Sequence, residues 1–502
     1  MPMRLGGRYL RIPLLENIFD GFRAVPEVPS DPVFRFKDPW PGNAQRGEIL
    51  VANEADLLAS ISPQSRDREL AQDDARRIRA HSFVWLRDLR SLGGEAARRT
   101  ARKVVAAWFD SDLRGDHIAW RPDIVGQRLT AWIGSYDFFA SSAGPSIRSD
   151  LMEQIASQTF WLRKRIGQVP SGPARFSALA GLAAGAAAVG ERENLFSTID
   201  RVFAIAKDSD IGRDGWIRNA SPISQLDSLM RLLDLRTAAN AVGRAPPEEI
   251  SEIITLVAGT LAAMRACDGG LSVFNGGEGD SWAIDLALAA SGWRGRAALD
   301  LPDAGYSRAL AGRSLLLLGA QNGAIEFGHG NDRIFVSTGS ISDAPAPRFQ
   351  RDNGSAFCAP MFKGARPLDF NAIERDSEEG ATLLTASFQQ SRPEINWRRR
   401  IFLAADGFDL RGEDFMETSS KQAGIIPFHL HPSADAIQVD ETSALIRTAS
   451  GHGWRLRANQ AINLSPEPYR GLPGVPSAAV RIELPIYPGR SGRWAIRKET
   501  NT

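Results

Sequence analysis

Two histidines stand one residue apart in the segment PFHLHPSADA, residues 427–436. Side chains two positions apart on a β-strand point to the same face, so His429 and His431 offer two imidazoles to one metal ion. A zinc site needs three or four protein ligands, and this pair supplies only two. The sequence therefore favours hydrogen-bonded strand histidines, and we expect no metal and no cofactor.

A second group of candidate residues lies in WRPDIVGQRLTAWIGSYDFF, residues 120–139. Arg128 and Trp132 are four positions apart, which places them on one face of a helix, and Arg121 and Tyr136 flank them. A guanidinium binds a carboxylate through two hydrogen bonds and an indole stacks on a sugar ring, so the pair suits a sugar acid. An equally good interpretation packs Trp132 between helices and pairs Arg128 with an aspartate.

Arg218 and Asn219 precede a predicted helix in the segment WIRNASP, residues 216–222. The N-terminal end of a helix carries partial positive charge, which makes it a suitable place for a carboxylate. The alternative is that Asn219 or Ser221 only caps the helix.

The glycine-rich segment FNGGEGDSW, residues 274–282, contributes Glu278 and Asp280. The two carboxylates fit the rim of a binding cleft, or the glycines serve only to permit a turn. Together with Asp214 they are also the candidates for the paired carboxylates of a glycosidase, although no sequence feature fixes their separation.

The first half of the chain has the periodicity of helices. In residues 221–242 apolar side chains recur every three or four positions behind Ser221 and Pro222, which suit the cap and the first position of a helix. The segment 172–190 is rich in small residues and suits close contact between helices.

After about residue 303 the period of the pattern becomes two. Residues 323–339 are typical of two strands joined by a tight turn, and residues 398–415 predict a hairpin that turns on Asp406 and Gly407. We therefore predict a helical part followed by an antiparallel β-sandwich, with N-terminal helices in 1–80, a helical domain in 81–302 and the sandwich in 303–502.

Composition excludes several functional classes. The 60 Lys and Arg residues and 59 Asp and Glu residues give a net charge of +1, so no global field attracts nucleic acid. Two cysteines exclude a disulfide framework, and no apolar run has the length of a membrane span. The N-terminal segment is a poor secretory signal, which favours a cytoplasmic protein or an N-terminus that lies elsewhere.

Seven segments resemble, in the same order, those of the heparinase II/III-like proteins, especially a group common in alphaproteobacteria. They are FKDPWPGNAQRGE (36–48), HSFVWLRDLRSLGG (81–94), AWRPDIVGQRLTAWI (119–133), RNASPISQLDSLMRLLDLR (218–236), CDGGLSVFNGGEGD (267–280), RRRIFLAADGFDLRGED (398–414) and FHLHPSA (428–434). The resemblance implies an incomplete α/α toroid followed by a β-sandwich. It also implies β-elimination next to a uronic acid, for which a carboxylate neutraliser, a base and an acid are needed.

The functional positions of the active relatives are replaced in this chain. By the resemblance, Ser224 stands where those relatives have a tyrosine, and SGPARF (171–176) lacks their asparagine. The segment GAQNGAIEF (319–327) has no histidine where the relatives have a His-x-His-x-Asp motif, and Ser337 stands at the position of a zinc-binding aspartate.

The sequence thus predicts a polysaccharide lyase-like protein that acts by β-elimination on an acidic, uronate-containing polysaccharide. The alternative is a non-catalytic carbohydrate-binding or envelope-polymer-associated protein on the same scaffold, and a hydrolase with paired carboxylates is a third option. The resemblance places the protein in the cell envelope or periplasm, whereas the N-terminal sequence favours the cytoplasm. The predicted site comprises Arg128, Tyr136 and Asn219 as catalytic residues and Arg121, Trp132, Arg218, Glu278 and Asp280 as binding residues.

Overall fold

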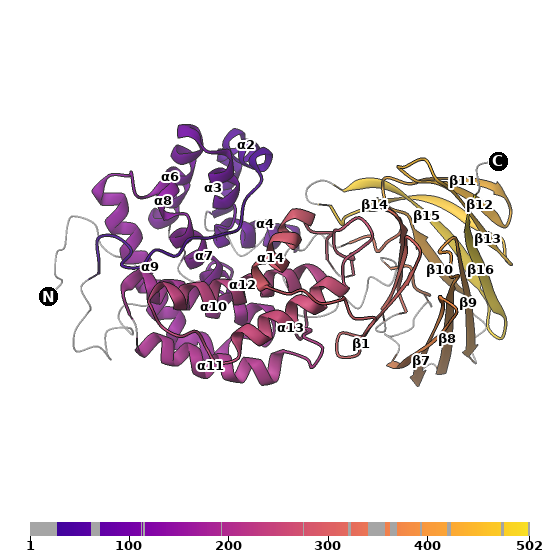
Figure 1. The fold of residues 1–502 in the computed structure, drawn as a ribbon. Coiled ribbons are helices and arrows are strands. Elements are labelled where there is room, and N and C mark those ends of the chain that lie inside the picture. The colour runs from indigo at the N-terminus through magenta and orange to yellow at the C-terminus, as the bar shows by residue number, and fades with distance from the viewer. Residues whose placement is uncertain are drawn as a thin grey trace. The chain divides into compact units, whose positions relative to one another are not determined.

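The computed structural model describes residues 28–61, 71–111, 113, 116–191, 193–274, 276–319, 323–339, 357–361, 369–391, 394–418, 423–472 and 476–499 (Figure 1). The chain folds into two compact units. Unit 1 comprises Met1–Asp210 and Ser228–Ile254, and unit 2 comprises Ile211–Asp227 and Thr255–Thr502. The three domain ranges expected from the sequence stay a prediction.

Helices occupy the N-terminal part of the chain up to Ser291. They are α2 (Ala44–Ala52), α3 (Glu54–Ile61), α4 (Ala71–Ser82), α5 (Leu86–Leu92), α6 (Gly94–Asp110), α7 (Pro122–Gly134), α8 (Tyr136–Phe139), α9 (Pro145–Arg165), the 3₁₀ helix η2 (Ile166–Gln168), α10 (Pro173–Val189), α11 (Asn194–Asp210), α12 (Pro222–Ala241), α13 (Ile250–Ala263) and α14 (Ser281–Ser291).

Helix α12 begins where the sequence predicts. Pro222 is its first residue, and Ser221 and Ser224 cap it reciprocally. Ser221 Oγ accepts a hydrogen bond from the Ser224 N–H at 3.3 Å, and Ser224 Oγ accepts one from the Ser221 N–H at 2.6 Å. Each bond satisfies a backbone donor that the first turn of a helix leaves unpaired.

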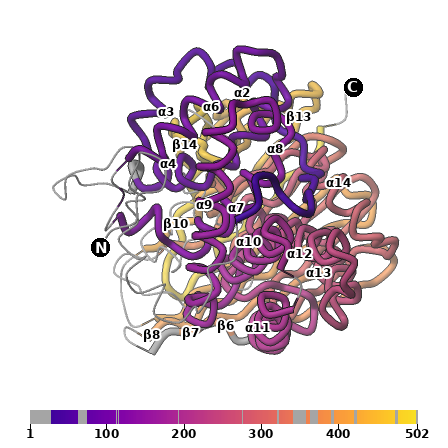
Figure 2. The backbone as a smooth tube through the Cα atoms, turned by 90° about the vertical axis from the view of Figure 1, so that its left-hand side faces the viewer, coloured from indigo at the N-terminus to yellow at the C-terminus, as the bar shows by residue number. Residues whose placement is uncertain are grey.

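The predicted small-residue helix is α10, which lies beside α7 and α9 in unit 1 (Figures 1 and 2). A Cβ added to Gly181 of α10 would lie 2.3 Å from the Cα of Gly126 of α7, so only glycine at these positions allows the two backbones to approach. The small residues therefore serve close helix–helix contact, as the sequence predicts.

Strands begin at Asp300. They are β1 (Asp300–Leu301), β2 (Tyr306–Ala311), β3 (Ser314–Gly319), β4 (Ile325–His329), β5 (Asp332–Phe335), β6 (Asp369–Glu378), β7 (Ala381–Ser391), β8 (Glu394–Leu403), β9 (Asp409–Thr418), β10 (Gly424–His429), β11 (Asp435–Asp440), β12 (Ser443–Arg447), β13 (Gly453–Ala458), β14 (Asn463–Tyr469), β15 (Ser477–Ile486) and β16 (Ser491–Lys498).

The strands form three antiparallel sheets. Their orders are β1-β2-β3-β4-β5, β10-β15-β14 and β11-β12-β13-β16-β9-β8-β7-β6. Both predicted hairpins are present as β4–β5 and β8–β9, and Gly407 in the second turn has a φ of 74°. Apolar side chains from all three sheets share one buried core, which makes this part a β-sandwich.

Burial alternates along β8, so that Trp397, Arg399 and Ile401 face the core. Arg399 is fully buried and pairs with Asp414 of β9, which is also fully buried, through Nε at 2.7 Å and Nη2 at 3.1 Å. The indole N–H groups of Trp397 and Trp494 donate to the same carboxylate at 3.1 and 3.3 Å. The sandwich therefore encloses an ion pair whose hydrogen bonds come from the protein itself.

In the part of the chain that the structure describes, no helix is long and apolar enough to cross a membrane.

Candidate functional site

Arg128 lies in the interior of unit 1 and is fully buried. Its Nε donates to Gln158 Oε1 at 2.8 Å, and its Nη1 donates to the carbonyl oxygens of His81 and Ala119, each at 3.0 Å. The guanidinium carbon lies 4.4 Å from the ring centroid of Trp108, and burial lowers the pKa of Arg128 to about 9. In this packing the side chain presents no surface to a ligand, and its predicted catalytic role stays a prediction.

The other residues predicted around Arg128 divide between the core and the surface. Trp132 is fully buried, and Tyr136, which is 1 % exposed, donates a hydrogen bond to Asp31 at 2.6 Å. Burial and the Asp31 carboxylate raise the pKa of Tyr136, so its hydroxyl keeps its proton. Arg121 is partly exposed and pairs with Asp123 at 2.6 Å.

The predicted residues of unit 2 lie in two loops. Arg218 and Asn219 are exposed before α12, and Asn219 has a φ of 62°. Because Ser221 and Ser224 cap α12, Asn219 is not needed as a cap. Asp280 is the N-terminal flanking residue of α14, where its side chain makes no capping hydrogen bond.

Asp214, a candidate for paired carboxylates, holds a turn instead. Its two carboxylate oxygens accept hydrogen bonds from the N–H groups of Trp216, Asp303 and Ala304, each at 2.9 Å. A carboxylate that satisfies three backbone donors has a structural role.

Glu278 is the centre of a hydrogen-bonded group within unit 2. Its Oε1 accepts hydrogen bonds from His431 Nε2 at 3.0 Å and from the hydroxyl of Tyr469. Arg333 lies 3.9 Å from Oε2 and pairs with Asp268 through two hydrogen bonds of 2.8 Å. We call Glu278, His431, Tyr469 and Arg333 the Glu278 cluster.

Four separate elements position this cluster. Glu278 lies in the loop before α14, where its N–H donates to the carbonyl of Gly471 at 2.9 Å. Tyr469 ends β14, Arg333 lies on β5, and His431 follows β10. A Cβ on Gly471 would lie 2.3 Å from the Tyr469 hydroxyl, so glycine is required for the phenol to reach Glu278.

The contacts of His431 define its tautomer. The Ser433 N–H donates to Nδ1 at 3.2 Å, and the Ser433 hydroxyl lies 2.7 Å from the same nitrogen. Nδ1 therefore accepts, and Nε2 carries the proton that is donated to Glu278. Because 15 % of the His431 side chain is exposed, the cluster reaches the surface at this imidazole.

Glu278 is ionised in this environment. Burial alone would raise its pKa, but the hydrogen bond from His431, the charge of Arg333 and the hydrogen bond from Tyr469 together lower it. Burial and the adjacent Glu278 carboxylate raise the pKa of Tyr469, which therefore acts as a hydrogen-bond donor. The arrangement holds the imidazole in one orientation, with Nε2 toward Glu278 and Nδ1 beside the exposed Ser433.

The two histidines of the FHLHP segment bind different carboxylates. His429 is fully buried and its Nδ1 lies 2.6 Å from Glu467 Oε1, whereas His431 contacts Glu278. Within the described ranges no group of three or more His, Cys, Asp and Glu side chains could hold a metal ion. The pair therefore does not converge on one point, and its role lies in hydrogen bonding.

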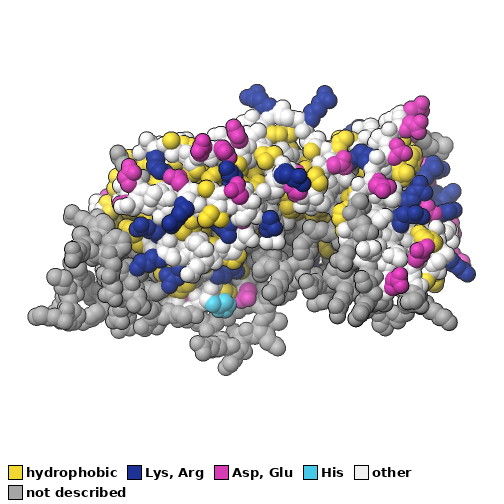
Figure 3. Space-filling view, turned by 90° about the horizontal axis from the view of Figure 1, so that it is seen from below, with side chains coloured by type: hydrophobic (Ala, Val, Ile, Leu, Met, Phe, Trp, Pro, Cys, Tyr) yellow, Lys and Arg dark blue, Asp and Glu magenta, His cyan; other side chains and the backbone are white. Residues whose placement is uncertain are grey.

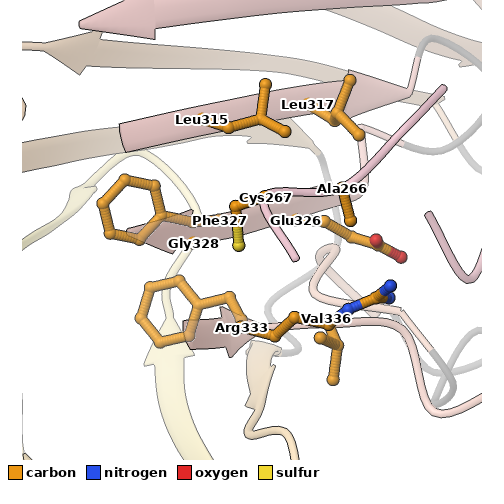
Figure 4. A pocket seen from close by; sticks show the side chains of 10 residues that line it. Ala266, Cys267, Leu315, Leu317, Glu326, Phe327, Gly328, Arg333 and Val336 are labelled. Carbon is orange, nitrogen blue, oxygen red and sulfur yellow. The ribbon is translucent and has the colours of Figure 1, made fainter. Parts of the chain in front are cut away.

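A small cavity lies on the other side of Arg333, between β3, β4 and β5 (Figure 4). Its volume is about 10 Å³, enough for no more than one water molecule and too small for a sugar. The Glu326 carboxylate and the Arg333 guanidinium lie on the same side of it. Glu326 Oε1 accepts hydrogen bonds from the N–H groups of Val273 at 2.9 Å and Ser337 at 3.2 Å.

Burial raises the pKa of Glu326 to about 7, although Arg333 and the N–H donors oppose the shift. An acid whose pKa rises on folding stabilises the protein below its unfolded pKa of 4.5, and this contribution is lost as the pH rises to about 7.

We expect Glu326→Gln to remove this dependence of the stability on pH. Between pH 5 and 8 the free energy of unfolding of the wild type should fall by roughly 3 kcal/mol relative to that of the variant, measured by denaturant unfolding. If the free energies of unfolding of the wild type and the variant differ by the same amount at pH 5 and pH 8, the raised pKa of Glu326 is wrong.

Comparisons with known proteins agree with this architecture. Solved structures of heparinase III and of a heparan sulfate lyase have the same fold, a helical toroid followed by a β-sandwich. A crystal structure of heparinase III aligns with a TM-score of 0.64 and 14 % identity over 97 % of this chain and 89 % of that chain. The heparan sulfate lyase HepC of Pedobacter heparinus aligns with a TM-score of 0.53 and 13 % identity over 90 % of this chain and 83 % of that chain.

Sequence comparison adds the family. Residues 349–493 match the family described as Heparinase II/III-like, C-terminal, so this part of the chain is similar to that family and the resemblance seen in the motifs is confirmed. FtsZ-localized protein C of Caulobacter vibrioides (strain NA1000 / CB15N) is 27 % identical over 468 residues, which cover 84 % of this chain and 79 % of that protein.

Proposed function

We propose that this protein acts on an acidic, uronate-containing polysaccharide by β-elimination, with His431 as the base. The observation that carries the proposal is the His431–Glu278 pair, in which an ionised carboxylate holds Nε2–H and leaves Nδ1 as the basic atom near the surface. The lyase scaffold supports the substrate class. The role of Glu278 is therefore to orient and stabilise the imidazole, as carboxylates do for histidine bases in other enzymes.

The proposed reaction needs a base beside C5 of the uronate. Nδ1 of His431 takes the C5 proton, the C–H electron pair forms the C4–C5 double bond, and the bond from C4 to the bridging oxygen breaks. The imidazolium so formed, stabilised by Glu278, then protonates the leaving oxygen. Ser433 occupies this side of the ring and is exposed, so the sugar must displace both its hydroxyl and its backbone N–H from Nδ1.

A second candidate function is binding without cleavage. Tyr136, Tyr306 and Tyr469 are buried and have raised pKa values, chiefly because of burial, so none of the three suits proton transfer. Ser224, at the position of the relatives' tyrosine, is engaged in the cap of α12. The Caulobacter relative is named for its localisation with FtsZ, which is compatible with a role of this chain as a binding protein in the cell.

The two candidates are separated by the ultraviolet absorbance of the new C4–C5 double bond, measured on a panel of uronate polymers. We expect the wild type to produce this absorbance with at least one polymer. His431→Gln, which keeps a polar side chain but removes the base, should lower the rate about a hundredfold. The control is His117→Gln, which changes an exposed histidine of unit 1 and should leave the rate unchanged.

The outcome also decides the second candidate. If the wild type gives no double bond with any polymer but binds one of them in a calorimetric titration, elimination is wrong and binding without cleavage is correct. If it neither cleaves nor binds a uronate polymer, both candidates are wrong.

A further inference from the structure

Arginines gather on the outer face of the eight-stranded sheet. Burial alternates along β8, β13 and β16, so that alternate residues of each strand face away from the core. Figure 3 shows Lys and Arg side chains gathered over the strand-rich part of the chain. We call the six outward arginines of these three strands the arginine face: Arg398, Arg400, Arg455, Arg457, Arg493 and Arg497.

The register of the strands brings these positive charges close together. Arg455 of β13 lies directly opposite Arg497 of β16, and like charges in this position destabilise a sheet. Strands lie about 4.8 Å apart, so the three strand intervals from β8 to β13 spread the face over about 15 Å.

Acidic neighbours neutralise only part of this charge. On β9, Glu413 is shared by Arg400 at 3.6 Å and Arg493 at 2.9 Å. Asp409 is 2.8 Å from Arg497 and also pairs with Arg411, and Glu499, which follows β16, pairs with Arg455.

Other arginines of the face lack such neighbours. Arg398 and Arg457 are exposed and have no acidic partner among the residues that the structure describes. The face therefore keeps a surplus of guanidiniums in a protein whose net charge is only +1.

We propose that the arginine face is a non-catalytic binding site for an extended acidic polysaccharide, whose carboxylate or sulfate groups pair with its guanidiniums. The inference rests on the proposed function for the class of ligand, and it adds a site separate from the Glu278 cluster. A guanidinium forms two parallel hydrogen bonds with either kind of anion, and a flat row of such groups suits a polymer with regularly repeated charges.

A membrane surface is a poorer match for this face. Exposed large apolar side chains that could enter a bilayer are absent from the outward positions of β8, β9, β13 and β16 in the described ranges. Phe408 is exposed but lies in the turn between β8 and β9. In the same sheet β11 has exposed Ile437 and Val439, but the described residues of β8, β9, β13 and β16 have charge without exposed apolar anchors, which favours a hydrated polyanion.

The test compares two variants that each remove four positive charges. The face variant combines Arg398→Ser, Arg400→Ser, Arg457→Ser and Arg497→Ser. The control variant combines Arg99→Ser, Arg201→Ser, Arg294→Ser and Arg296→Ser, all at exposed positions outside the arginine face. Both are first checked for an unchanged melting temperature, and binding to polygalacturonate and to heparin is then measured over a range of salt concentrations.

We expect the face variant to bind the polymer that the wild type prefers about a hundredfold more weakly, with a smaller salt dependence, while the control variant binds normally. Polygalacturonate and heparin distinguish carboxylate from sulfate as the preferred group. Wild-type affinity in the face variant, or an equal loss in the control variant, would overturn the inference and leave the proposed function intact.

Two further outcomes separate the inference from its premise. If the wild type binds neither of these two polymers nor any other polymer of the uronate panel, the proposed function itself fails. If the wild type binds vesicles of phosphatidylglycerol but no polymer, and the face variant no longer binds the vesicles, the face recognises a membrane and the inference is wrong.

Discussion

Asp414→Ala should lower the free energy of unfolding by about 3–5 kcal/mol, because it leaves the buried charge of Arg399 without its partner. Both side chains are fully buried, and two carbonyl oxygens, of Gly323 and Cys358, are the other acceptors of the Arg399 guanidinium. The substitution also removes the acceptor of the indole N–H groups of Trp397 and Trp494. Four donor contacts are lost in a region that water does not reach.

Denaturant unfolding of the wild type and the variant measures this effect. The matched control is Glu413→Ala, which removes the neighbouring carboxylate on the opposite face of β9. Glu413 pairs with Arg400 and Arg493 at the surface, where such pairs contribute less than about 1 kcal/mol. If both variants lose the same free energy of unfolding, the buried ion pair stabilises the protein no more than a surface pair does.

Arg128→Ala is the second substitution with a large expected effect, again about 3–5 kcal/mol. It opens a cavity beside Trp108 and leaves Gln158 and two carbonyl oxygens without their donor. The control is Arg121→Ala on the same segment, whose partly exposed pair with Asp123 should contribute less than about 1 kcal/mol.

The same variant tests the role that the sequence suggests for Arg128. If Arg128→Ala unfolds at the wild-type denaturant concentration but binds uronate oligosaccharides more weakly, the side chain contacts the ligand and our interpretation of its burial is wrong. A loss of stability with unchanged binding by the remaining folded protein identifies Arg128 as a structural residue.

Local pattern was sufficient to predict much of the fold. Ser221 and Pro222 start α12, and Asp406 and Gly407 turn the β8–β9 hairpin, because caps and turns depend on residues that are neighbours in the chain. Alternating burial in β8 follows from the same kind of rule. The change of period near residue 303 predicted the order of the helical and strand-rich parts, and the resemblance to the lyase family added the toroid.

The candidate site could not be predicted in the same way. Tyr469 lies 191 residues from Glu278 and His431 lies 153 residues from it, and no spacing rule relates positions so distant. Arg128 and Trp132 share a helix face as expected, but α7 is buried on nearly every side, so a shared face does not mean a shared cleft. Periodicity identifies the faces of a helix, whereas tertiary packing decides which of them solvent reaches.

The chain passes between its two compact units three times, and two of these passages occur inside α12 and α13. During synthesis, unit 1 therefore stays incomplete until residue 254 has left the ribosome, long after its first 210 residues. Residues 211–227 can pack with the rest of unit 2 only later, because that part of the unit begins at residue 255. A stop codon at position 211 would consequently release a protein that lacks part of its first unit, and neither unit corresponds to one uninterrupted stretch of the gene.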